Sequence, residues 1–190
     1  KDMSEKIAVL FPGKRYSCDL PLLYFANCIY RDSGYDVLNL TYPETDFEGK
    51  PDARVYEKIE RSILAQAKAA GLDSYKEAVF ISKSMGTVAA GWLAGKTKVP
   101  VRHIFLTPLE ETFPYMKKSC VAAVLQGTAD KWLEPAKLEA FCRENELRLV
   151  KFRDVGHRLE KSGDIMASID NFRKVAELYL EDVSLHPAVP

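Results

Sequence analysis

Short apolar runs alternate along the chain with longer segments whose apolar residues recur at helical spacing. Several of the short runs are continuously apolar, which is typical of strands in a sheet covered on both faces. The pattern predicts six strands, at Ile7–Phe11, Asp36–Leu40, Ala78–Ser82, His103–Thr107, Val121–Gln126 and Leu147–Phe152. It also predicts helices at Leu20–Arg31, Asp52–Ala70, Thr87–Ala94, Glu134–Glu144 and Gly163–Leu180.

This order of elements predicts the fold class. Repeated strand–helix–strand units form parallel sheets with helices on both faces. We therefore expect an α/β fold with a mostly parallel six-stranded sheet, in a single domain spanning residues 1–190. In the last helical segment, the residues expected to face the core are Ile165, Ile169, Phe172, Val175, Ala176 and Tyr179.

The composition narrows the function classes. The 190 residues are 47% hydrophobic and 28% charged, and 27 basic side chains balance 27 acidic ones. A net charge of zero argues against a dominant electrostatic role at nucleic acid or a membrane surface, and no apolar stretch approaches the ~20 residues that cross a bilayer. The cysteines lack metal-site spacing, so we interpret them as reduced, mostly buried thiols of a cytoplasmic protein: Cys18, Cys28, Cys120 and Cys142.

The stretch S-K-S-M-G after the third predicted strand indicates a nucleophile. Ser84 follows the strand and precedes a helix, and the residues two before and two after it, Ser82 and Gly86, are small enough for a tight turn. The start of a helix directs backbone N–H groups at the turn, so the N–H of Met85 is a candidate oxyanion donor. The alternative is that Ser84 only caps the helix.

Two further strand ends carry the groups that such a serine needs. Asp130 follows the fifth predicted strand and His157 follows the sixth, so that His157 could accept the serine proton while Asp130 orients the imidazole. Glu110 and Glu111 are rival acids. A serine–lysine pair with Lys83 is an alternative, although we expect that side chain to point elsewhere. Two histidines are not expected to act: His103 as a structural residue and His186 in a frayed tail.

These motifs together resemble the α/β-hydrolase family over nearly the whole chain: IAVLFPG, ISKSMG, LQGTAD and VGHRLE. The family's nucleophile motif is usually G-x-S-x-G, whereas here a serine takes the first small position. The loop Pro12-Gly13-Lys14-Arg15 matches the family's oxyanion loop, which makes the Lys14 N–H the second expected donor, with Arg15 next. The short connection between the fourth and fifth predicted strands resembles members that lack a lid.

The resemblance implies a serine hydrolase that cleaves a carboxylic ester or thioester of a small-molecule acyl substrate, without a cofactor or metal ion. The alternative is an inactive hydrolase-like scaffold that binds a ligand or a protein partner. A flavodoxin-like domain is a weaker option, because the loop after the first predicted strand is poor in glycine and hydroxyl groups. We expect the segments Tyr42–Pro51 and Glu110–Ser119 to border the pocket.

Overall fold

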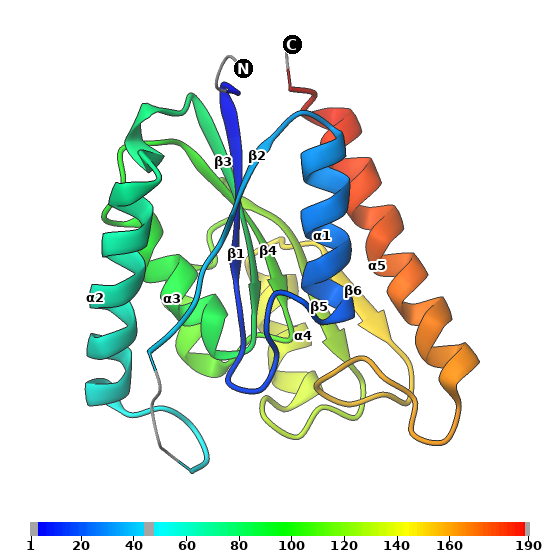
Figure 1. Cartoon of the computed structure of the whole chain (residues 1–190). Coiled ribbons are helices and arrows are strands. Elements are labelled where there is room, and N and C mark those ends of the chain that lie inside the picture. The colour runs from blue at the N-terminus through cyan, green and yellow to red at the C-terminus, as the bar shows by residue number, and fades with distance from the viewer. Residues whose placement is uncertain (1–3, 44–47, 189–190) are drawn as a thin grey trace.

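The computed structural model describes residues 4–43 and 48–188, in which a twisted sheet lies between two layers of helices (Figure 1). The strands are β1 (Lys6–Phe11), β2 (Asp36–Asn39), β3 (Glu77–Lys83), β4 (Val101–Leu106), β5 (Val121–Gly127) and β6 (Leu149–Phe152). Their order in the sheet is β2-β1-β3-β4-β5-β6, and every neighbouring pair is parallel. The predicted α/β fold with a six-stranded sheet is confirmed.

The helices divide between the two faces of the sheet. They are α1 (Pro21–Asp32), α2 (Ala53–Ala69), α3 (Met85–Ala94), α4 (Pro135–Glu144) and α5 (Ile165–Leu185), with 3₁₀ turns η1 (Leu72–Ser74) and η2 (Glu110–Tyr115). Helices α1 and α5 pack against each other on one face, and α2 and α3 cover the other (Figure 1). Successive strand residues enter opposite layers: Val79 lies in the core beneath α1 and α5, and Phe80 in the core beneath α2 and α3.

Helix α5 differs from the prediction in its length and in the face that it buries. It continues to Leu185, and the side chains of Ile165 and Ile169 are 71% and 48% exposed, so the prediction that these two face the core is wrong. The core-facing stripe begins one turn later, at Phe172, and continues through Val175 and Tyr179. The first turns of α5 line the cavity described below instead.

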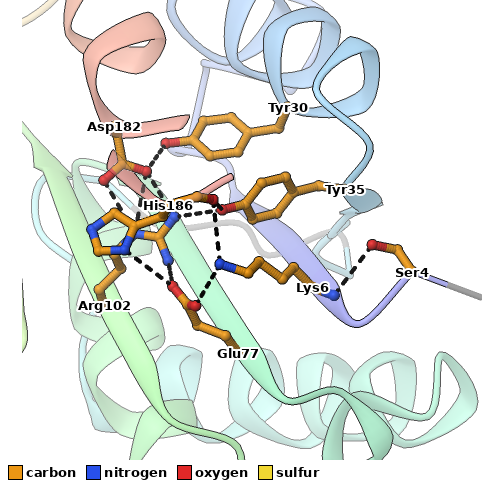
Figure 2. Close-up of polar contacts among 8 residues, drawn as sticks. All are labelled: Ser4, Lys6, Tyr30, Tyr35, Glu77, Arg102, Asp182 and His186. Carbon is orange, nitrogen blue, oxygen red and sulfur yellow. Dashed lines mark hydrogen bonds and ion pairs between the residues drawn. The ribbon is translucent and has the colours of Figure 1, made fainter. Parts of the chain in front are cut away.

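A network of buried charged side chains connects α5 to the amino ends of the strands (Figure 2). It lies at the end of the sheet opposite the predicted site. Asp182 accepts hydrogen bonds from Tyr30 Oη at 2.6 Å and from Arg102 Nη2 at 2.8 Å, and Arg102 also pairs with Glu77. The backbone oxygen of His186 accepts a hydrogen bond from Lys6 Nζ at 3.3 Å. His186 therefore ends α5 inside this network, and the prediction of a frayed tail there is wrong.

Within the two described ranges, no helix is both long and apolar enough to cross a membrane. The cysteines are all unpaired; Cys18 and Cys142 are buried, whereas Cys28 and Cys120 are partly exposed. We expected most of the cysteines to be buried, and two of the four are.

Candidate active site

Ser84 occupies a strained turn between β3 and α3. Its backbone has φ 57° and ψ −124°, a conformation that non-glycine residues rarely adopt. The turn is held from two sides. The Ser84 N–H donates to the Leu106 carbonyl of β4 at 3.0 Å, and a Cβ atom at Gly86 would lie 2.5 Å from the carbonyl oxygen of Pro12. Only glycine fits there, which explains the small residue in the motif.

The turns that follow β5 and β6 are tied together by backbone hydrogen bonds. The Thr128 N–H donates to the Phe152 carbonyl at 2.8 Å, and the Ala129 N–H donates to the Val155 carbonyl at 2.9 Å. The Thr128 hydroxyl accepts from the Asp154 N–H at 2.9 Å. These contacts fix the turn that carries Asp130 against the turn that carries His157.

The structure brings Ser84, His157 and Asp130 together in one hydrogen-bonded chain. His157 Nε2 lies 2.7 Å from Ser84 Oγ, and His157 Nδ1 lies 2.8 Å from Asp130 Oδ2. The other carboxylate oxygen of Asp130 accepts the Trp132 N–H at 2.9 Å. With Asp130 holding Nδ1–H, the imidazole presents an unprotonated Nε2 to the serine hydroxyl, which is the arrangement that activates a serine.

Burial shapes the electrostatics of His157. The Asp130 side chain is fully buried, whereas that of His157 is 17% exposed. Desolvation lowers the pKa of His157, the hydrogen bond that the ring donates to Asp130 opposes that shift, and the charge of Lys83 adds to it. The net direction is downward, so at neutral pH the ring is a neutral base.

The loop after β1 lies directly against Ser84. Gly13 and Tyr16 close a tight turn, with the Gly13 N–H donating to the Tyr16 carbonyl at 2.9 Å, and a Cβ atom at Gly13 would lie 3.4 Å from that of Ser84. Lys14 and Arg15 form the exposed tip of this turn. On the other side, Met85 is the first residue of α3, so its N–H has no acceptor within the helix. The loop after β1 and the first turn of α3 thus flank the serine.

An open cavity of about 1370 Å³ lies over Ser84 and His157. Its walls come from the loop after β1, the segment 48–51, Trp132 and the first turns of α5. The prediction that Tyr42–Pro51 borders the pocket is therefore confirmed for its last four residues, 48–51. Residues 44–47 of that segment lie outside the described residues. The prediction for Glu110–Ser119 is wrong: Leu109 lines the cavity, but these ten residues, all of them described, do not.

The rival acids lie elsewhere. Glu110 pairs with Lys137 at 2.6 Å and Glu111 with Lys50 at 3.5 Å, both on the surface. Among the residues that the structure describes, no three His, Cys, Asp or Glu side chains are grouped as a metal site.

Lys83 is the residue whose position the sequence does not reveal. It is 1% exposed, lines the cavity and donates a hydrogen bond to Thr107 Oγ1 at 2.6 Å. Its hydrogen bond goes to Thr107 and not to Ser84, as expected, although the residue lines the same cavity as the serine. The only signal in the sequence is its place as the last residue of an apolar strand, where a lysine is unusual.

Known proteins resemble this chain in their structures but not detectably in their sequences. No family model matches the chain, and no curated protein gives a significant sequence match. A lidless α/β serine hydrolase from Xanthomonas campestris superposes with a TM-score of 0.66 at 15% identity, over 100% of this chain and 86% of that one. The protein Est1E from Butyrivibrio proteoclasticus, with ferulic acid bound, gives 0.68 at 15% identity, over 96% and 94%.

An esterase from Pyrococcus furiosus gives a TM-score of 0.62 at 12% identity, over 94% of this chain and 82% of that one. At these identities the likeness is one of fold. The chain has the α/β-hydrolase fold, and its connection between β4 and β5, residues 107–120, contains only the 3₁₀ turn η2.

Proposed function

We propose that this α/β-hydrolase-fold protein is a serine hydrolase that cleaves carboxylic esters or thioesters through an acyl-enzyme on Ser84. One observation carries the proposal: the hydrogen-bonded chain from Ser84 Oγ through the His157 ring to the buried carboxylate of Asp130. The structural similarity to serine hydrolases and esterases supports the reaction class.

The reaction follows from these contacts. Ser84 Oγ attacks the acyl carbonyl as its proton passes to His157 Nε2, and the imidazolium that forms is stabilised by Asp130. The N–H groups of Met85 and Lys14 donate to the oxyanion. Collapse of the intermediate expels the alcohol or thiol, which takes the proton from His157, and leaves Ser84 acylated. His157 then activates a water molecule that releases the acid and regenerates the serine.

The cavity favours a substrate with an apolar part. Trp132, Ile165 and Phe172 contribute apolar surface to its wall, and exposed Trp132 and Ile165 stand at its mouth. Basic side chains also line the cavity, among them Arg15 and Lys50, so an acidic substituent on the substrate would be accommodated.

A fluorophosphonate probe tests the proposal without knowledge of the substrate, because it reacts with serines that a base has activated. The full chain is treated with the probe and the labelled residue is identified by mass spectrometry, with Ser84→Ala and His157→Ala in parallel. We expect labelling at Ser84 in the wild type and none in either variant. A folded wild-type protein that stays unlabelled would contradict the proposal and favour a ligand-binding scaffold without turnover.

A further inference from the structure

Lys83 is a buried cation without a carboxylate partner. Among the described residues, no acidic oxygen lies within ion-pairing distance of its Nζ atom, although its side chain is almost wholly buried. Its contacts are the Thr107 hydroxyl, at 2.6 Å, and the ring of Tyr16, whose centroid lies 5.3 Å from Nζ. Buried lysines are rare because removing the ammonium group from water is costly.

Thr107 is itself held in an unfavourable backbone conformation. It is fully buried with φ 43°, which is exceptional for a β-branched residue. Its N–H donates to the Leu125 carbonyl of β5 at 2.8 Å, so its hydroxyl is presented beside the end of β3. Such strain concentrates at functional sites, where the surrounding structure maintains it.

Lys83 lines the same cavity as Ser84 and His157. Lys83 immediately precedes Ser84, Thr107 directly follows the neighbouring strand β4, and Asp130 follows β5, the strand after that. Tyr16 belongs to the loop that flanks Ser84, and its ring lies 5.3 Å from Lys83 Nζ and 5.2 Å from the guanidinium carbon of Arg158, the residue next to His157. The amine of Lys83 is therefore buried within the site that holds the serine and the histidine.

We propose that Lys83 is a positioning residue whose charge, held by Thr107 and Tyr16, keeps His157 in its neutral, proton-accepting form. The inference rests on the proposed hydrolase function and adds a fourth side chain to that site. A positive charge in the same buried site opposes protonation of the imidazole, and at the same time attracts the Asp130 carboxylate that orients it.

The electrostatics of the two groups agree with this role. Burial lowers the pKa of Lys83 to about 7; the charge of Asp130 opposes that shift, Arg158 adds to it and Glu160 opposes it. Desolvation holds the pKa of His157 below its ordinary value, and the charge of Lys83 adds to that shift. While Lys83 is protonated, its charge therefore opposes protonation of His157.

The test is the pH profile of fluorophosphonate labelling in the full chain, for the wild type, Lys83→Met and Lys83→Arg. In Lys83→Met we expect the acidic limb to move to higher pH, so that labelling at about pH 5.5 falls roughly 3- to 10-fold while the rate at about pH 9 stays within about twofold. Lys83→Arg keeps the charge and should keep the wild-type limb. Lys151→Met, which removes an exposed cation paired with Glu139, is the control for charge loss in general.

A second pair of variants covers the case in which Lys83→Met does not fold. Thr107→Ala removes the hydroxyl that accepts from Lys83, so it should shift the acidic limb of the labelling profile in the same direction but by less. Thr107→Ser keeps the hydroxyl, so its profile should match that of the wild type. A profile lowered equally at all pH values, or an unmoved acidic limb in both Lys83→Met and Thr107→Ala, overturns the inference. If the wild type is not labelled at all, the proposed function fails.

In that case, NMR titration of the His157 ring in the wild type and in Lys83→Met still tests the inference about Lys83. The same titration midpoint of His157 in both proteins would refute it.

Discussion

His157 Nε2 lies 2.7 Å from Ser84 Oγ, although 73 residues separate the two positions in the sequence. Ser84 follows β3 and His157 follows β6, and both β4 and β5 lie between these strands in the sheet. Three strand spacings amount to roughly 14 Å, so the turn after β6 must reach back across the ends of two strands to meet the serine. Asp130 follows β5, the strand next to β6, and holds Nδ1, the ring nitrogen of His157 that does not face the serine.

Replacing the carboxylate that holds His157 should slow the reaction without disturbing the fold. Asp130→Asn keeps the volume but favours the wrong imidazole tautomer, so we expect fluorophosphonate labelling of Ser84 to slow roughly a hundred- to ten-thousandfold. Rapid-mixing kinetics with mass spectrometry measure the rate. Glu110→Gln, at the surface pair with Lys137, is the matched control and should leave the rate unchanged; equal slowing in both variants would contradict the assignment of Asp130.

A methyl group at position 86 should destabilise the chain. Its Cβ would lie 2.5 Å from the Pro12 carbonyl oxygen and 2.7 Å from that of Phe11, neither of which can move without shifting the end of β1. We expect Gly86→Ala to reduce the free energy of unfolding by roughly 1–3 kcal/mol and to slow labelling of Ser84. Urea denaturation measures the first effect. Gly95→Ala is the control: its Cβ has a nearest contact of 3.4 Å and helical φ, so this variant should be as stable as wild type or slightly more so.

His103 should make the chain less stable in mild acid. Its ring stacks on Phe105 inside the sheet, and burial lowers its pKa to about 4. Between the ordinary histidine value of about 6.5 and about 4, the unfolded chain binds a proton that the folded chain does not. This site therefore removes up to about 3 kcal/mol of stability as the pH falls through that window.

Unfolding by urea at several pH values checks this effect in the wild type and His103→Phe. We expect the variant to lose less stability between neutral pH and pH 4, because the remaining titrating groups are common to both proteins. Identical slopes in the two proteins would show that His103 is protonated, or accessible to protons, in the folded state.

The charge network of Figure 2 should contribute to stability and not to reactivity. Asp182 is 6% exposed and neutralises Arg102, so Asp182→Ala leaves a buried guanidinium group with less compensation. We expect a loss of roughly 3–5 kcal/mol in the free energy of unfolding, with labelling of Ser84 in the folded protein unchanged. Glu181→Ala breaks an exposed pair with Arg148 one residue away and should cost less than about 1 kcal/mol. Comparable losses of unfolding free energy in the two variants would refute the distinction between the buried and the exposed ion pair.

The fold could be predicted from the sequence because its signals are local and repeated. Most strands are apolar runs that end at a turn. Because these runs alternate with helical segments along the chain, the sequence predicts a parallel sheet. Asp130 and His157 could be named because parallel strands place their following residues at one edge. The start of α5 is the exception, because periodicity identifies an apolar stripe but not what lies opposite it: Ile165 and Ile169 are exposed, and Ile165 lines the cavity.

Only part of the position of Lys83 can be read from the sequence. Alternation along β3 puts it on the same face as Val79 and Ile81, but its hydrogen bond to Thr107 depends on the left-handed conformation of that threonine, which has no residue signature. The cavity border is a similar case. Leu109 lines the cavity and residues 110–119 turn away from it through η2, a turn with no periodic pattern of its own.

Backbone hydrogen bonds join the turns after β5 and β6 directly to each other, whereas the turn that carries Ser84 is bonded to β4. We therefore expect the distance from serine to histidine to respond more to small displacements than the distance from histidine to aspartate. Heating or mild denaturant should therefore reduce nucleophilicity before any strand separates, and the loss should reverse on cooling.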